Sequence, residues 1–274
     1  MIRAAVLGAD VSKSRSPAIH QAAFDALGVE GQYVAISVDG RGFRSTVRQL
    51  AEQGYRYLNV TIPHKRAAAA LADVASPLVK TTRAANTLIL RNGRRVRGEN
   101  TDGYGLLTAL ADLGVVVKAG QVHVLVGSGG AAAGGLAALV GAGAAVRVVA
   151  RRTAAARGLG RGLPVRARSR VQVFPWTPAG LATALEGAAS LISAVPAAAW
   201  QGSEARAGLR GLDRRAAVLE MAYGGVTPLA AAARDHVARY QDGLPMLVHQ
   251  AARAVELALG KKPPAEPLLK AARG

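Results

Sequence analysis

The chain has 274 residues, half of them apolar but only 4% aromatic, which is enough for two modest domains with cores built from alanine, valine and leucine. It has no cysteine, which excludes disulfides, cysteine metal ligands and a cysteine nucleophile, and which suits a reducing cytoplasm. Lysine and arginine (35) outnumber aspartate and glutamate (17), and the formal net charge of +18 raises the question of a nucleic-acid partner.

The positive charge is mostly spread along the chain. Few aromatic side chains that could stack on bases stand near its strongest concentration. We therefore expect a solvated surface that attracts phosphorylated small molecules, and no nucleic-acid partner. That concentration follows Val149 and consists of Arg151, Arg152, Arg157, Arg161, Arg166, Arg168 and Arg170.

Neither apolar segment that could suggest a membrane protein supports that interpretation. Residues 4–9 are too few for a signal peptide and end at Asp10. Residues 124–146 carry no charge and exceed the ~18–20 residues that cross a bilayer. They are rich in glycine, however, and divide into strand, turn, helix and strand. We expect a cytoplasmic protein without a membrane partner.

The first third of the chain alternates between predicted strands and helices, which implies parallel strands joined by crossover helices. Ser16 before Pro17, and Thr61 before Pro63, are expected to cap the helices that follow them. Strands are predicted at 2–7, 33–38 and 57–61, helices at 17–27, 43–52, 65–71 and 74–81, and a hairpin at 85–90 and 94–98 that turns at Asn92-Gly93.

The pattern restarts after a helix that ends near Leu113, so a domain boundary is placed near Asp102. The second half repeats the order of strand, helix and strand, and an apolar helix closes it. The fold class is therefore α/β with two domains. Strands are predicted at 121–126, 145–150, 171–174, 190–194 and 216–220, and helices at 131–140 and 244–259.

The glycine-rich turn at residues 127–132 follows a predicted strand and opens a helix, which is the context of a dinucleotide-binding site. Glycine permits the tight turn and close approach to a pyrophosphate, and the helix N-terminus offers N–H groups to phosphates. A purely structural turn stays open as the alternative. The predicted cofactor-binding residues here are Gly127, Ser128, Gly129, Gly130 and Ala131.

The preferred nucleotide is predicted from a missing carboxylate. No aspartate or glutamate occurs between Asp112 and Glu186, whereas Arg151, Arg152 and Thr153 stand where a ribose-binding carboxylate is usual. Guanidinium groups there pair with a 2′-phosphate. The predicted cofactor is NADP, in a Rossmann-like domain at residues 102–238.

Hydride transfer at an alcohol or ketone also requires a group that exchanges a proton with the oxygen. The five histidines show no supporting pattern and no metal-ligand spacing, so no metal is expected. Lys65 and Asp102 each follow a predicted strand and stand near the start of a helix. Alone, the segment from Asn59 to Lys65 also fits an ordinary turn with a solvated lysine.

Five segments in chain order resemble the shikimate dehydrogenase family. Residues 14–20 are similar to its Ser-x-Ser-Pro-x-x-His motif and residues 59–65 to its Asn-Val-Thr-x-Pro-x-Lys motif. Residues 85–87 resemble Ala-Val-Asn-Thr, and residues 100–103 match Asn-Thr-Asp-Gly. Residues 242–251 resemble the closing Asp-Gly-x-x-Met-Leu-x-x-Gln-Ala.

The resemblance implies NADP-dependent interconversion of shikimate and 3-dehydroshikimate, in the biosynthesis of chorismate and aromatic amino acids. Lys65 would donate the proton and Asp102 would orient it, although Lys65 could instead mainly stabilise charge. Gly243 is expected among the cofactor-binding residues. For the substrate, the resemblance implies Ser14, Ser16 and Tyr223 at the carboxylate and Asn59, Thr61, Asn86 and Gln250, with Asp102, at the ring oxygens.

The resemblance also implies a discontinuous substrate domain, in which residues 239–274 return as a helical segment to residues 1–101 so that Gln250 meets Lys65. The chain departs from the family pattern at Ala9-Asp10, Lys13, Arg151 and residues 193–196. The alternatives are a quinate/shikimate or aminoshikimate dehydrogenase, and an inactive nucleotide-sensing or nucleic-acid-binding regulator. A monomer or a homodimer is expected.

Overall fold

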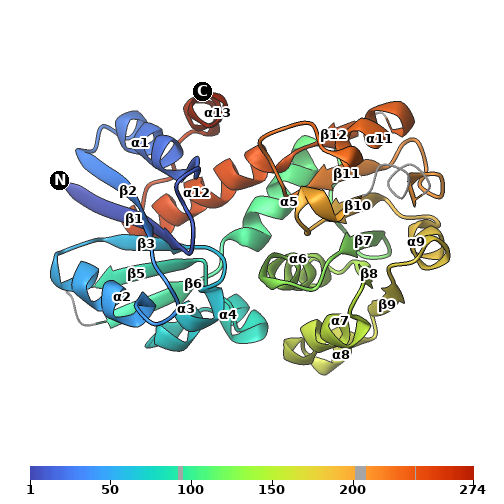
Figure 1. The fold of residues 1–274 in the computed structure, drawn as a ribbon, viewed down its shortest axis with the longest axis horizontal. Coiled ribbons are helices and arrows are strands. Elements are labelled where there is room, and N and C mark those ends of the chain that lie inside the picture. The colour runs from blue at the N-terminus through green and yellow to red at the C-terminus, as the bar shows by residue number, and fades with distance from the viewer. Residues whose placement is uncertain (92–94, 201–207, 238) are drawn as a thin grey trace. The chain divides into compact units, whose positions relative to one another are not determined.

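The alternation of strands and helices builds two separate β-sheets in the computed structural model, which describes residues 1–91, 95–200, 208–237 and 239–274. The chain divides into two compact units (Figure 1). One comprises Met1–Gly105 and Leu247–Gly274, and the other Leu106–Met246. The predicted α/β fold class is confirmed.

The sheet of the first unit has the order β2-β1-β3-β5-β6-β4. β1 pairs in parallel with β2 and β3, whereas β5 runs antiparallel to β3 and β6. After β1, the chain adds β2 on one side of β1 and then β3 on the other side. This change of direction makes a topological switch point between β1 and β3, and open α/β sheets bind ligands at such points. The strands are β1 (Ile2–Gly8), β2 (Gly31–Ser37), β3 (Tyr57–Val60), β4 (Val74–Ala75), β5 (Thr87–Arg91) and β6 (Arg95–Glu99).

The helices of the first unit come from both ends of the chain. Phe43, Val47 and Leu50 of α2 are buried in a core with Leu58 and Leu88 of the sheet. At the other end of the chain, α13 packs against α1. The helices are α1 (Ser16–Ala26), α2 (Phe43–Glu52), α3 (Lys65–Leu71), α4 (Pro77–Thr82), α13 (Ala265–Arg273) and the part of α12 (Gly243–Leu259) from Leu247 onward.

Both predicted helix caps in this unit are wrong. Ser16 is the first residue of α1, and Arg15 precedes it without a side-chain cap. Thr61 lies one turn too early: its carbonyl accepts a hydrogen bond from His64 N at 2.9 Å, and α3 starts at Lys65. The prolines at 17 and 63 predicted the approximate start of each helix, but they did not predict which residue caps it.

The helix predicted at 74–81 is also wrong in its first residues. Val74 and Ala75 pair with β6 as a short strand, and the side chain of Ser76 then caps α4. β5 and β6 pair as an antiparallel hairpin, and its predicted turn at Asn92-Gly93 lies outside the described residues.

The sheet of the second unit is parallel throughout and has the order β12-β11-β10-β7-β8-β9. Counted from its first strand, this is the order 6-5-4-1-2-3 of dinucleotide-binding folds. The edge strand β12 was not predicted, because it is short and its residues are Arg, Tyr and Gln. The strands are β7 (Val122–Val126), β8 (Ala145–Ala150), β9 (Val171–Pro175), β10 (Ser190–Ser193), β11 (Ala217–Glu220) and β12 (Arg239–Gln241).

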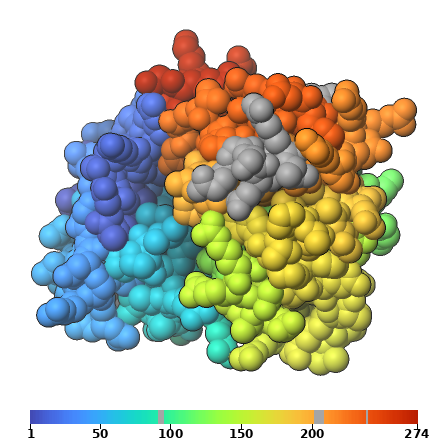
Figure 2. Space-filling view, turned by 45° about the vertical axis from the view of Figure 1, so that its right-hand side comes forward, coloured from blue at the N-terminus to red at the C-terminus, as the bar shows by residue number. Residues whose placement is uncertain are grey.

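The segment 124–146 divides into β7, a turn, α6 and β8, as predicted. In the described parts of the chain, no helix has the length and apolarity that a bilayer crossing requires. The arginine concentration after Val149 lies on the surface, coloured lime to yellow in Figure 2, and all seven side chains are exposed. The remaining helices are α5 (Asp102–Asp112), α6 (Gly130–Gly141), α7 (Thr153–Leu159), η1 (Gly160–Gly162), α8 (Val165–Arg168), α9 (Pro178–Leu185), η2 (Ala197–Ala199) and α11 (Pro228–His236).

Candidate active site

Lys65 and Asp102 form a nearly buried ion pair in the first unit. Lys65 Nζ donates to Asp102 Oδ2 at 2.7 Å, and only 15% and 4% of the two side chains are exposed. Lys65 is the first residue of α3 and Asp102 the first of α5. Loss of either partner would leave an uncompensated charge in this site.

Asn86 holds the other carboxylate oxygen of Asp102. Its Nδ2 donates to Asp102 Oδ1 at 2.8 Å and to Thr101 Oγ1 at 3.0 Å. Its Oδ1 accepts from Thr101 N at 2.8 Å and from Thr87 Oγ1 at 3.1 Å. These contacts fix the orientation of the amide, and the carboxylate of Asp102 is fixed with it.

Asn59 extends this hydrogen-bond network toward β2. Its Oδ1 accepts from the Tyr33 hydroxyl at 2.8 Å, and its Nδ2 donates to Thr87 Oγ1 at 3.0 Å. A continuous series of contacts thus joins Tyr33, Asn59, Thr87, Asn86, Asp102 and Lys65. Tyr33 and Thr87 were not among the predicted site residues.

His20 supports the network from the core. Its ring stacks on Tyr33, with centroids 4.1 Å apart and planes 5° apart, and its Nδ1 lies 2.7 Å from the Tyr57 hydroxyl. Burial lowers the pKa of His20 to about 3. The imidazole is therefore neutral at physiological pH and serves packing rather than proton transfer.

The other predicted substrate residues of the first unit follow β1 and β3 or lie on α12. Ser14 Oγ accepts from the backbone N of Ser16 at 3.2 Å, and Ser16 is buried. Thr61 follows β3, and its N donates to Leu7 O at 2.9 Å. Gln250 Oε1 is buried and has no donor within the described residues, so this acceptor suits a ligand hydroxyl.

Tyr223 lies in the second unit, on the segment after β11, and the residue is exposed. Its predicted contact with the substrate stays a prediction.

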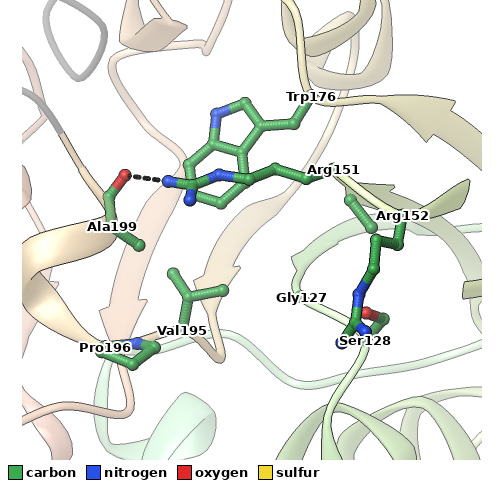
Figure 3. A pocket seen from close by; sticks show the side chains of 9 residues that line it. Gly127, Ser128, Arg151, Arg152, Trp176, Val195, Pro196 and Ala199 are labelled. Atoms are coloured by element: carbon green, nitrogen blue, oxygen red, sulfur yellow. Dashed lines mark hydrogen bonds between the residues drawn. The ribbon is translucent and has the colours of Figure 1, made fainter. Parts of the chain in front are cut away.

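The second unit contains a pocket of about 260 Å³ at the carboxyl ends of four parallel strands (Figure 3). Ligands of open α/β sheets bind at such ends. Of the predicted cofactor residues, four line it: two from the glycine turn and two arginines after β8. The lining residues are Gly127, Ser128, Ala150, Arg151, Arg152, Trp176, Val195, Pro196 and Ala199.

The glycine turn has the backbone that the prediction requires. Gly127 has φ +127, a conformation that L side chains rarely adopt, and a Cβ there would lie 3.0 Å from Ala194 O. Gly129 is extended, and Gly130 and Ala131 open α6 with their N–H groups at its N-terminus. Two arginines, no carboxylate in the lining and this helix start fit the phosphates of NADP.

Five predicted cofactor residues do not line this pocket: Gly129, Gly130 and Ala131 of the glycine turn, and also Thr153 and Gly243. Thr153 is the first residue of α7, directly after Arg152. Gly243 opens α12, and a Cβ there would lie 2.1 Å from Met221 O, so close packing alone explains this glycine. Their cofactor roles stay predictions.

Five lining residues were not among the predicted cofactor residues: Ala150, Val195 and Pro196, and also Trp176 and Ala199. Trp176 follows β9 and Ala199 ends η2, and neither belongs to a motif. An aromatic residue just after a parallel strand, beside a basic segment, is the one signal that could have found Trp176.

Four histidines have structural contacts rather than a place in either site. Besides His20, His64 Nε2 contacts Val38 O at 2.7 Å and His236 Nε2 contacts Leu212 O at 2.8 Å. His123 Nδ1 contacts Ser190 Oγ at 2.8 Å, and burial lowers the pKa of His123 to about 4.

Comparison with known proteins identifies the family. Residues 6–88 match the shikimate dehydrogenase substrate binding domain, and residues 243–273 match the shikimate 5′-dehydrogenase C-terminal domain. A shikimate dehydrogenase (NADP⁺) of Anaeromyxobacter sp. (strain Fw109-5) is 39% identical over 272 residues, 97% of this chain and 94% of the relative. The chain belongs to the shikimate dehydrogenase family.

Solved structures of this family share the fold. Shikimate 5-dehydrogenase of Thermus thermophilus, in complex with NADP(H) and shikimate, has a TM-score of 0.83 and 30% identity, covering 100% of this chain and 99% of that one. The Mycobacterium tuberculosis shikimate dehydrogenase has a TM-score of 0.85 and 31% identity, covering 100% and 99%. The predicted family and its NADP cofactor are confirmed.

Proposed function

We propose that this protein interconverts 3-dehydroshikimate and shikimate by hydride transfer with NADP(H), a step in the biosynthesis of aromatic amino acids. The observation that carries this proposal is the nearly buried pair of Lys65, which opens α3 after β3, and Asp102, which Asn86 holds. It is supported by the arginine-lined pocket in the second unit and by family membership.

Lys65 serves the reacting oxygen. NADPH supplies the hydride when bound. The ammonium of Lys65 stabilises the negative charge that develops on the carbonyl oxygen and donates the proton in reduction. Asp102 keeps this ammonium in place, and Asn86 and Asn100 fix Asp102 through its carboxylate and its backbone N.

The substrate is held mainly by hydroxyls and amides of the first unit. Ser14 and Ser16, with Tyr223, donate to the carboxylate, and Thr61, Asn59 and Gln250 contact the ring hydroxyls. Gln250 Oε1 supplies an acceptor that no donor in the described part of the chain uses. Both amide hydrogens of Asn86 donate within the protein, so Asn86 acts on the substrate mainly through Asp102.

The cofactor is held by two groups of residues. Gly127, Ser128, Gly129, Gly130 and Ala131 bind the pyrophosphate at the start of α6, with Gly243 close to the cofactor. Arg151, Arg152 and Thr153 form the region that selects the 2′-phosphate.

We further propose the domain assignment, the assembly and the location of the enzyme. Residues 1–101 and 239–274 bind the substrate, and residues 102–238 bind NADP. The protein acts in the cytoplasm, as a monomer or a homodimer. Light scattering on the purified protein measures the assembly.

Steady-state assays with shikimate or quinate, each with NADP⁺ or NAD⁺, test the proposed reaction. The highest kcat/KM is expected for shikimate with NADP⁺. Higher efficiency with quinate or NAD⁺ would indicate a different substrate or cofactor, and strong salt-dependent DNA binding without dehydrogenase activity would indicate a regulator.

Lys65→Ala tests the mechanism. We expect kcat to fall by about 10²- to 10⁴-fold, because the acid and the positive charge at the reacting oxygen are both lost. Shikimate should still bind, measured by calorimetry. Arg66→Ala is the matched control, since it removes the neighbouring exposed charge and should leave kcat unchanged. Retention of most of kcat in Lys65→Ala would remove Lys65 from the mechanism.

A further inference from the structure

Arg151 is fixed as one wall of the pocket in the second unit. Its guanidinium carbon lies 4.9 Å from the centroid of the Trp176 ring, and its Nη2 donates to Ala199 O at 2.9 Å. Figure 3 shows the guanidinium lying across the indole. The stacking and the hydrogen bond together determine where the plane of this cation lies.

Trp176 is itself held in place by contacts with other residues of this unit. Its ring lies 5.0 Å from that of Trp200, which is buried and whose Nε1 donates to Ser193 Oγ at 2.9 Å. Trp176 packs against the hydrophobic core of this unit. The flat surface formed by Trp176 and Arg151 is therefore present before any ligand binds, which lowers the entropy cost of binding a planar group.

Arg152, unlike Arg151, is not fixed by a ring contact or by a side-chain hydrogen bond within the described part of the chain. It lines the same pocket and is exposed, but its side chain makes no hydrogen bond, ion pair or ring contact with any residue that the structure describes. In Figure 3 its side chain extends toward Ser128 of the glycine turn. All five N–H groups are available for a bidentate contact with an anion.

We propose that the two arginines have different tasks. Arg151, supported by Trp176, forms a flat cationic wall that stacks on the adenine, whereas Arg152 alone pairs with the 2′-phosphate. This inference rests on the proposed function, and it divides between two residues the phosphate-binding role that the sequence assigned to both. Arg151 and Trp176 thus determine cofactor affinity, and Arg152 determines cofactor selectivity.

The division of tasks has a measurable signature, because NADPH and NADH share the adenine and differ in the 2′-phosphate. Loss of the wall weakens both cofactors by the same factor. Loss of the phosphate ligand weakens NADPH alone. The ratio of the two dissociation constants therefore separates the two roles, whatever the catalytic activity of the variant.

Calorimetric Kd values for NADPH and NADH should be measured for wild type, Arg151→Gln and Arg152→Gln. We expect Arg152→Gln to weaken NADPH about 10- to 100-fold and NADH less than about twofold. Arg151→Gln should weaken both about 3- to 10-fold and leave their ratio unchanged. Arg157→Gln, which removes an exposed charge of α7 that does not line the pocket, is the matched control and should change neither Kd appreciably.

Trp176→Leu and Trp176→Phe test the support of the wall. Trp176→Leu should weaken both cofactors like Arg151→Gln, and Trp176→Phe, which keeps an aromatic face, should weaken them less. Circular dichroism checks the fold, and Trp176→Phe and Arg151→Gln keep the test decisive if Trp176→Leu does not fold.

Two outcomes would overturn the inference alone. One is a loss of preference for NADPH over NADH, measured as the ratio of their Kd values, that is as large in Arg151→Gln as in Arg152→Gln. This result would make Arg151 a phosphate ligand. The other is wild-type affinity for both cofactors in Arg151→Gln and Trp176→Phe. Failure of the wild-type protein to bind either cofactor would instead contradict the proposed function.

Discussion

Tyr33 is the residue that joins the core of the first unit to its polar network. Its ring stacks on His20, and its hydroxyl donates to Asn59 Oδ1 at 2.8 Å. Without that donor, the Asn59 amide loses one of the contacts that fix its orientation and keeps its donation to Thr87. We therefore regard Tyr33 as a positioning residue for Asn59.

Tyr33→Phe should raise the KM for shikimate about 3- to 10-fold, because one hydrogen bond of about 1 kcal/mol is lost while the stacking on His20 remains. kcat and the Kd of NADPH should stay within about twofold of wild type. Tyr55→Phe is the control, since the contact seen for Tyr55 is made by its ring, with Arg3. An equal fall in kcat with unchanged KM would contradict a positioning role.

At this scale the sequence predicted residues that belong to motifs and missed those that do not. Lys65 and Asp102 were singled out because each follows a predicted strand, the family resemblance implied that they act together, and the structure brings Lys65 Nζ within 2.7 Å of Asp102 Oδ2. Tyr33 could not be found in this way, because its hydroxyl reaches Asn59 only when β2 and β3 lie on either side of β1. Trp176 was identified only from the structure, because it lines a pocket formed by residues far apart in the sequence.

Among the elements, β1 ends where there is no space for a larger side chain. A Cβ at its last residue, Gly8, would lie 2.5 Å from Thr61 Cγ2 and 2.7 Å from Val11 Cγ1. Atoms this close must move apart. The end of β1 thus sets the position of Thr61 after β3.

Gly8→Ala should displace Thr61, lower the free energy of unfolding by about 1–3 kcal/mol and raise the KM for shikimate. The Kd of NADPH should not change, because the cofactor pocket lies in the other unit. Urea denaturation and steady-state kinetics measure these effects. Gly40→Ala, where no atom lies within 4 Å of the added Cβ, should behave as wild type, and similar behaviour of Gly8→Ala would refute the packing argument.

Strands and helices were predictable where their apolar period was long, as in α2 and β8. Helix starts were less predictable: Ser16 and Thr61 have the chemistry of caps, but the turns before α1 and α3 place other residues at the cap position. β12 depends on pairing with β11 rather than on its own polar sequence. Tertiary contacts, which local patterns do not contain, decided these cases.

For the whole molecule, buried histidines make stability depend on pH. Burial lowers the pKa of His20 to about 3 and that of His123 to about 4, against about 6.5 when unfolded. The unfolded chain therefore binds more protons below pH ~6.5. The stability due to each neutral histidine is present above that pH and is lost as the pH falls toward the folded value.

His123→Gln should reduce this dependence in the second unit. As the pH falls from ~6.5 to about 4, each buried histidine lowers the free energy of unfolding by up to about 1.4 kcal/mol per pH unit. The difference between variant and wild type, from urea denaturation at several pH values, should change with pH by this amount. Burial also raises the pKa of Glu220, so the stabilising effect of Glu220 is lost as the pH rises. Glu220 is present in both proteins, so its contribution cancels when the free energy of unfolding of the wild type is subtracted from that of the variant. A difference that stays constant with pH would contradict the prediction.

The division of the chain into units has a consequence for biosynthesis. The first unit needs residues 247–274, which include Gln250 and the helix α13 that packs on α1. A ribosome makes these residues after the complete second unit. The nascent chain can thus fold its second unit early, whereas the unit that holds Lys65 and Asp102 is completed only after residues 247–274 have been made.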